Sequence, residues 1–164
     1  MEDENEEIIE EFLEESNLIE REYSMDALTD ALKAWEYAYE NRGNITVKYI
    51  LEIHRLLAKN LRPDIAGKVR DCSVMIGYHI KKKKPEEELL LELREWIDNC
   101  IPKGKKATEK EVQKWHVKFE AIHPHEDFNG RTGRILWQIQ RINNGLPIKI
   151  IYEKEKYSYY KWFK

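Results

Sequence analysis

One segment of twelve residues holds most of the side chains that could carry chemistry. It reads His-Pro-His-Glu-Asp-Phe-Asn-Gly-Arg-Thr-Gly-Arg over residues 123–134 and lies between two stretches with helical periodicity. His123 can accept a proton near neutral pH, and Asp127 supplies a hard oxygen ligand of the kind that Mg²⁺ prefers beside phosphates. With two arginines nearby, the segment predicts nucleotidyl or phosphoryl transfer.

A helix is predicted to begin at Asn129, which places its first turn against this segment. The first turn of a helix has unpaired N–H groups and the positive end of the helix dipole, and both favour an anion such as phosphate. Gly130 lets the backbone approach a ligand closely. Arg131 and Arg134 are three positions apart, so both can reach the same anion. Because cationic side chains oppose the dipole there, their presence favours a bound polyanion.

The segment resembles the signature of the Fic-domain family, His-x-Phe-x-Asp/Glu-Gly-Asn-Gly-Arg-x-x-Arg, which often has proline second. The matching residues are His123, Pro124, Asp127, Asn129, Gly130, Arg131 and Arg134. Two positions differ: His125 stands at the family's phenylalanine, and Phe128 stands at its first glycine. A buried imidazole at position 125 needs a hydrogen-bond partner. If the glycine has a positive φ, Phe128 is strained there.

The resemblance implies transfer of AMP from ATP to a hydroxyl group on the Ser, Thr or Tyr of a target protein. In that reaction His123 deprotonates the hydroxyl and Asp127 holds Mg²⁺ on the phosphates. The phosphate-binding residues that the resemblance implies are Asn129, Gly130, Arg131 and Arg134. Two related reactions stay open, namely phosphoryl transfer and removal of AMP.

The family also has a β-hairpin, called the flap, that pairs with an extended target segment. Residues 69–80, VRDCSVMIGYHI, are rich in β-branched side chains and contain Gly77, which predicts a short hairpin. An exposed strand edge can bind a peptide in this way. The resemblance therefore implies a flap near residues 69–80, with the target-binding positions Val74, Met75, Ile76 and Gly77.

The N-terminal residues 1–23 predict an amphipathic helix that carries a second motif. Its acidic start contains an apolar stripe at helical spacing, made of Ile8, Ile9, Phe12 and Leu13. Ser16 and Glu20 match Ser/Thr-x-x-x-Glu-Gly/Asn, an inhibitory motif of some Fic proteins, with Arg21 at the small residue. The resemblance implies that Glu20 pairs with Arg134 and blocks the position of the γ-phosphate.

The remaining helices must position these motifs. Apolar periodicity together with capping residues predicts helix starts at Ser24, Thr46, Pro85, Thr108 and Asn129. We expect an extended stretch at 148–152 and an aromatic last helix at 157–163. The expected fold is mainly α: one Fic-fold domain over residues 1–164, with the inhibitory helix in 1–23 and the core in 24–164. His54 and His116 lie on apolar helix faces and are interpreted as core residues.

Composition excludes several protein classes. The 164 residues carry 28 Lys+Arg and 31 Asp+Glu, a net charge of −3, which disfavours a nucleic-acid partner. The sequence contains no apolar run near the ~20 residues that a membrane helix needs. The acidic N-terminus does not resemble a signal peptide, so we expect a cytoplasmic protein with Cys72 and Cys100 as reduced thiols.

Other interpretations remain open at this point. His123, His125 and Asp127 alternate along the chain and could be ligands of a metal hydrolase. A helical binding module that has lost catalysis would also keep the fold. The cluster of aromatic residues near the C-terminus leaves a homo-oligomer open, although docking on the same domain is the simpler interpretation.

Overall fold

The helices account for most of the chain, and the strands form a single small sheet. The computed structural model describes residues 2–102 and 104–164. The α-helices are α1 (Glu2–Ile19), α2 (Met25–Glu40), α3 (Val47–Ala58), α4 (Glu86–Asn99), α5 (Glu109–Ile122), α6 (Asn129–Asn143) and α7 (Lys156–Tyr160). The strands are β1 (Val74–Ile76) and β2 (His79–Lys81), and the short 3₁₀ helices are η1 (Glu153–Glu155) and η2 (Lys161–Phe163).

Capping residues begin the helices where the sequence predicts. The Ser24 hydroxyl accepts a hydrogen bond from the Ala27 N–H at 3.2 Å, and Thr46 caps α3 in the same way. Thr108, where a helix start is predicted, forms a capping box with Glu111, with each side chain accepting from the other residue's backbone N–H. The starts of α2, α3 and α5 therefore follow from residues close together in sequence.

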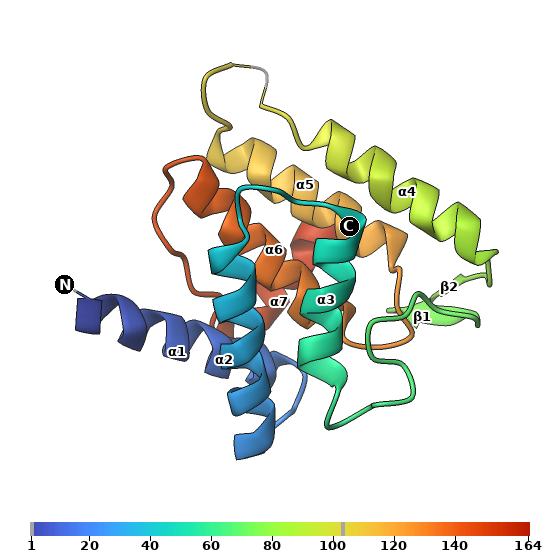
Figure 1. Ribbon diagram of the computed structural model, residues 1–164, viewed down its shortest axis with the longest axis horizontal. Helices are drawn as coiled ribbons and strands as arrows, with labels where there is room; N and C mark the ends of the chain where they lie inside the picture. The colour runs from blue at the N-terminus through green and yellow to red at the C-terminus, as the bar shows by residue number, and fades with distance from the viewer. Residues whose placement is uncertain (1, 103) are drawn as a thin grey trace.

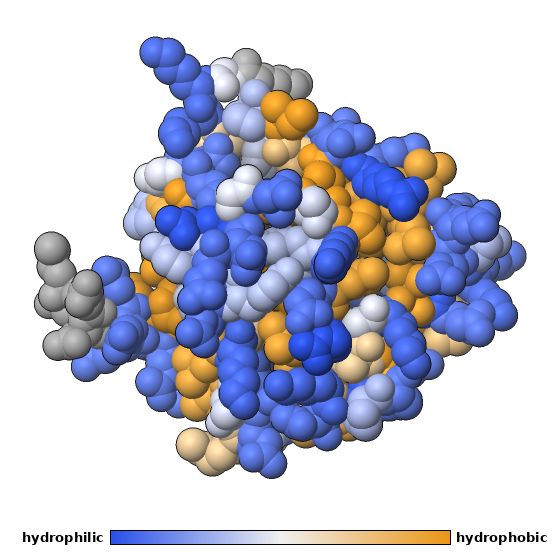
Figure 2. All heavy atoms as spheres, viewed as in Figure 1, coloured by the Kyte–Doolittle hydropathy of each residue, from blue (hydrophilic) through white to orange (hydrophobic). Residues whose placement is uncertain are grey.

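Helix α6 lies at the centre of the molecule, and nearly all of its side chains are buried. Figure 1 shows it behind α2 and α3, with α5 and α4 above it. Trp35, Trp96 and Trp115 are all buried in the core. On the face drawn in Figure 2, apolar atoms gather between α3 and α4, where the core reaches the surface. The site segment 123–134 is therefore anchored to the most buried helix.

The predicted hairpin is present at one side of the helical body, next to the start of α4 (Figure 1). Its antiparallel register pairs Val74 with Lys81 and Ile76 with His79. Gly77 takes the first of the two turn positions with φ +57°. A two-residue hairpin turn with glycine first needs this positive φ.

The extended stretch expected at 148–152 lies outside any helix, and Tyr152 has extended backbone angles of φ −75° and ψ 141°. The Lys149 N–H donates to the side-chain amide of Gln138, and the Lys149 carbonyl accepts from the same amide. The prediction for the aromatic segment is corrected: it is not one helix, because it divides into the end of α7 and the 3₁₀ helix η2. Tyr159 within it is buried against the domain, as the simpler interpretation expects.

Among the helices of the described residues, none combines the length and the apolar character that crossing a bilayer requires.

Candidate functional site

Two residues with left-handed backbone conformations bound the site loop. His123 ends α5 with φ +50° and ψ +62°, and Phe128 precedes α6 with φ +67° and ψ +16°. His125 lies between these two residues, and the side chain of Asn129 bonds its backbone. The Asn129 side chain accepts from the His125 N–H at 2.9 Å and donates to the His125 carbonyl at 2.8 Å. The Asn129 side-chain amide is therefore used to hold the loop closed.

Phe128 adopts the positive φ that was expected to strain it. For a residue with a side chain this conformation costs about 1–2 kcal/mol. Its buried ring offsets that cost, because the Arg131 guanidinium lies 3.6 Å from the ring centre and the His54 ring meets its edge. The Phe128 side chain thus fixes the position of Arg131 inside the site.

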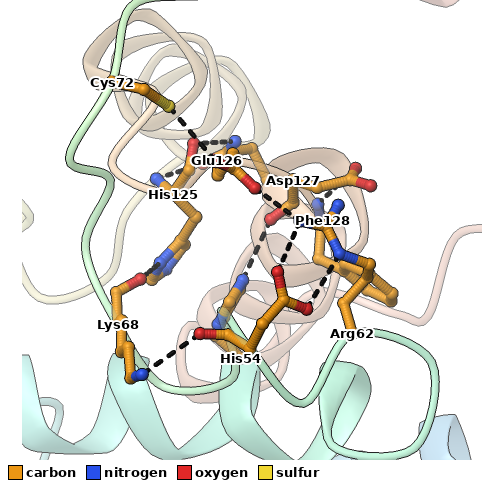
Figure 3. A network of polar contacts seen from close by, with 10 residues as sticks. His54, Arg62, Lys68, Cys72, His125, Glu126, Asp127 and Phe128 are labelled. Carbon is orange, nitrogen blue, oxygen red and sulfur yellow. Dashed lines mark hydrogen bonds and ion pairs between the residues drawn. The ribbon is translucent and has the colours of Figure 1, made fainter. Parts of the chain in front are cut away.

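His125 is fully buried, and Figure 3 shows its side chain turned toward the Lys68 carbonyl. Its Nδ1–H donates to the Lys68 carbonyl at 2.7 Å, and its ring stacks on His54 with centroids 3.6 Å apart. His54 accepts from the Gly67 N–H and donates to the Asp127 carbonyl, so it is the satisfied core histidine that was expected. The Nε2 atom of His125 has no partner among the described residues.

These contacts argue against the metal-hydrolase interpretation. The ring of His125 is engaged elsewhere, because its Nδ1–H donates to the Lys68 carbonyl and its face stacks on His54. Within residues 2–102 and 104–164, no three His, Cys, Asp or Glu side chains are grouped so as to hold a metal ion.

Substituting His125 with phenylalanine tests the buried imidazole through pH. Burial, followed by the proximity of His54, lowers the pKa of His125 well below its usual value. Because only the unfolded chain takes up this proton near pH 6, the stability due to a neutral His125 is lost as the pH falls below about 6.5. We expect His125→Phe to reduce the pH dependence of the unfolding free energy by up to about 1.4 kcal/mol per pH unit between pH 6.5 and 5.

Urea unfolding at pH 7.5, 6.5, 5.5 and 5.0 measures this slope. The exposed His79 gives the matched control, and His79→Gln should leave the slope unchanged. The slope is the readout, rather than stability at one pH, because phenylalanine also loses the bond to Lys68. Equal slopes for wild type and His125→Phe would contradict the prediction.

The surroundings of His123 favour its neutral form. Burial lowers its pKa, and the positive charges of Arg70 and Lys81 act in the same direction. A lowered pKa keeps the imidazole neutral, and therefore able to accept a proton, at neutral pH. The guanidinium of Arg70 also donates to the His123 carbonyl at 2.8 Å.

The first turn of α6 forms a cationic cradle, which we define as Gly130, Arg131 and Arg134. Arg131 and Arg134 are 8% and 2% exposed. Within the described part of the chain, Arg131 makes no ion pair, and its Nε has no hydrogen-bond partner. A Cβ atom on Gly130 would lie 2.5 Å from a carboxylate oxygen of Glu20, so the glycine leaves room for a negative group directly above the helix.

Glu20 fills this cradle. Its carboxylate accepts from Arg134 Nη2 at 2.7 Å, and the Ser16 hydroxyl and carbonyl accept from the same guanidinium at 2.8 and 3.0 Å. Burial alone would raise the pKa of Glu20, but Arg134 and Arg131 hold it below its usual value. Burial raises the pKa of neighbouring Glu120 to about 8, so at neutral pH Glu20 is the ionised partner of Arg134.

The end of α1 accounts for the small residue in the inhibitory motif. Arg21 has φ +57°, its N–H donates to Leu18, and the Glu22 N–H donates to Asn17. These two bonds form a Schellman ending, in which a left-handed residue follows the helix. Glycine or asparagine takes this conformation at lower cost than arginine, but with Arg21 in this position the Glu20 carboxylate still bonds Arg134 on α6.

Asp127 fits a magnesium ion that is shared with a nucleotide. One carboxylate oxygen accepts from the Phe128 N–H at 2.7 Å, and the side chain is exposed. Mg²⁺ is commonly bound by one or two carboxylates together with phosphates and water. An exposed carboxylate on the site loop suits that arrangement, and its role as the Mg²⁺ ligand stays a prediction.

The hairpin places its named positions at the surface beside the loop. Met75 is 56% exposed, Gly77 is exposed, and Val74 and Ile76 are half-buried. The Arg70 N–H donates to the Pro124 carbonyl at 2.8 Å, which ties the chain before the hairpin to the site loop.

Sequence reasoning missed Arg70 and Lys68. An arginine among β-branched residues before a hairpin resembles an ordinary surface position, and a backbone carbonyl such as that of Lys68 leaves no signal in sequence. The only available hint was the imidazole at position 125, which predicted a partner without identifying it.

Comparison with known proteins gives consistent results. Residues 44–140 match the sequence profile of the family described as Fic/DOC. The chain is 31% identical over 134 residues to Protein adenylyltransferase Fic of Drosophila melanogaster, covering 82% of this chain and 27% of that protein. It is 30% identical over 118 residues to the protein of the same name from Culex quinquefasciatus, covering 72% and 24%. The chain thus spans about a quarter of the length of the curated relatives it matches.

Solved structures agree on the fold. A Fic-domain-containing signaling protein from Bacteroides thetaiotaomicron superposes with a TM-score of 0.79 at 20% identity, covering 96% of this chain and 70% of that one. Fic-1 (residues 134–508) from C. elegans superposes with a TM-score of 0.66 at 25% identity, covering 83% and 41%.

Proposed function

This chain belongs to the Fic/DOC family, and from that premise we propose that it transfers AMP from ATP to a hydroxyl side chain of a target protein. The observation that carries the proposal is the cationic cradle beside His123. A carboxylate already occupies the place where a helix N-terminus and two buried arginines favour an anion. The name of the curated relatives, protein adenylyltransferase, supports the same reaction.

The proposed reaction assigns one step to each group. The phosphates of ATP bind at the first turn of α6, where Arg131 and Arg134 neutralise their charge. The neutral imidazole of His123 takes the proton of the target hydroxyl as its oxygen attacks the α-phosphorus. The bond from the α-phosphorus to the bridging oxygen breaks, and pyrophosphate leaves. A magnesium ion held by Asp127 would neutralise charge on the phosphates.

Glu20 acts as a brake in this proposal. Its carboxylate uses the Arg134 donor that the terminal phosphate of ATP would otherwise bind. Because two anions cannot share that donor, ATP binds with its phosphates displaced, or Glu20 must leave. Autoinhibition thus follows from competition for one guanidinium.

Isotopic labelling tests the proposed reaction. The Glu20→Gly protein is incubated with lysate proteins as acceptors and ATP labelled at either the α- or the γ-phosphate. We expect label in protein from the α-position only. Label from the γ-position alone would indicate a kinase, and loss of label from previously labelled proteins would indicate AMP removal. No label from either position would favour a catalytically silent binding module.

A further inference from the structure

Arg70 is a buried cation between the hairpin and the site loop. It is 3% exposed and lies just before β1 in the chain. Its Nε donates to the His123 carbonyl at 2.8 Å, and its Nη1 donates to the carbonyls of Cys72 and Lys82, both at 2.9 Å. A single side chain thus joins the two ends of the hairpin to the residue proposed as the base.

Carbonyl dipoles, rather than a carboxylate, satisfy this guanidinium. Neighbouring Asp71 pairs with Lys83 instead, and within the described residues no carboxylate forms an ion pair with Arg70. Its Nη2 is buried and has no hydrogen-bond partner in that part of the chain. Burying a charge without a counter-ion is costly, so a simple staple between loop segments would be cheaper to build with a neutral side chain.

The bond to His123 acts on a residue in a restricted conformation. A left-handed non-glycine residue persists only where its surroundings hold it there. The carbonyl of His123 is held by Arg70, and the next carbonyl, that of Pro124, accepts from the Arg70 N–H. Arg70 therefore sets the direction of the peptide from which the imidazole projects.

We propose that Arg70 is a positioning residue that fixes the flap relative to His123, so that a target segment bound along the flap presents its hydroxyl to the imidazole. This inference rests on the proposed function, since it concerns the geometry of the same transfer. A shift of about 1 Å between reacting groups can lower a rate by about a hundredfold. The guanidinium reaches all three carbonyls at once, which the single amine of lysine does not.

The test compares Arg70→Met and Arg70→Lys in the Glu20→Gly background. For Arg70→Met we expect α-label incorporation into lysate proteins to fall about a hundredfold, with the affinity for ATP, measured by calorimetry, unchanged within twofold. Arg70→Lys should fall between Arg70→Met and the parent, and it serves as the folded variant if Arg70→Met does not fold. Arg62→Gln is the matched control: it breaks a surface ion pair to Glu126 on the same loop and should leave the rate unchanged.

Two measurements on the protein alone separate this inference from the proposed function. By NMR, the His123 imidazole should titrate at a higher pH in the Arg70 variants, because a nearby positive charge is lost or moved. Hydrogen exchange should speed up together in residues 74–81 and 123–128. If the parent transfers no AMP, the proposed function fails. The two readouts still test whether Arg70 couples the hairpin to His123.

Three outcomes would overturn the inference. One is an unchanged transfer rate in a folded Arg70→Met protein. Another is a rate loss that follows weaker ATP binding, because Arg70 would then act on the nucleotide site. The third is faster exchange in the hairpin alone with an unchanged His123 titration, which is what a merely structural residue would produce.

Discussion

Replacing Glu20 with glycine should raise AMP incorporation into target proteins by about one to two orders of magnitude. The carboxylate of Glu20 makes a charge-assisted hydrogen bond to the buried Arg134, and such bonds contribute about 1.5–3 kcal/mol. When this bond is lost, ATP no longer competes with it, and each 1.4 kcal/mol of its free energy corresponds to about a tenfold gain in productive nucleotide binding. Initial rates of label incorporation from α-labelled ATP, at subsaturating ATP, measure the gain.

Two further variants establish that the charge of Glu20 is responsible. Glu20→Gln keeps the shape of the side chain but forms a weaker bond to Arg134, so its rate should lie between those of wild type and Glu20→Gly. Glu22→Gln is the matched control, because the Glu22 carboxylate accepts from the Ser24 N–H at 3.2 Å rather than from Arg134. Equal rates for wild type and Glu20→Gly would show that Glu20 is not the brake.

Removing the imidazole of His123 should have the second large effect. In the Glu20→Gly background, His123→Ala should lower AMP incorporation by about 10²–10⁴-fold, the usual contribution of a general base. ATP affinity should stay within about threefold, because the phosphates contact the first turn of α6 rather than the imidazole. Single-turnover label transfer, together with calorimetric ATP binding, separates these two quantities.

The pH profile of the parent enzyme adds an independent check. His123 works as a base only when neutral, so the rate falls as the pH drops below its pKa in the folded protein. Because burial lowers that pKa, the decline should set in below the ordinary histidine value of about 6.5. His79→Ala, at an exposed flap position, is the control and should keep the profile of the parent. A His123→Ala enzyme with the parent's rate would remove His123 from the mechanism.

Much of the fold was predictable because its signals are local. The capping box of Thr108 and Glu111 and the glycine turn at Gly77 each depend on residues within a few positions of one another. Residues 148–152 show the limit of such signals, because the expected extended stretch leaves the partner of its backbone unidentified. The backbone of Lys149 bonds the side chain of Gln138, and neither hydrophobic periodicity nor residue propensity indicates that contact.

The consequences of the two departures from the family signature, His125 and Phe128, were also predictable only in part. Sequence alone indicated that Phe128 would be strained if its φ were positive and that His125 would need a partner. The positive φ is present, and the compensating contacts of Phe128 with Arg131 and His54 are tertiary. The partner of His125 is a main-chain carbonyl 57 residues earlier in the chain, at Lys68.

By itself, the sequence determined the family, the helical fold and the position of the anion site at the start of α6. Residue types and short spacings encode those features, because helix caps and a first-turn cradle form among near neighbours in the chain. The pairing of Glu20 with Arg134, 114 residues away, was implied by the resemblance, and the structure contains it. Tertiary structure alone decided that the Glu20 carboxylate lies over Gly130 and that Arg70 holds the carbonyl of His123, 53 residues away. Such contacts form only when α1 and the hairpin pack against the central helices, which brings together residues that are far apart in the chain. Patterns of short sequence spacing do not indicate these long-range contacts.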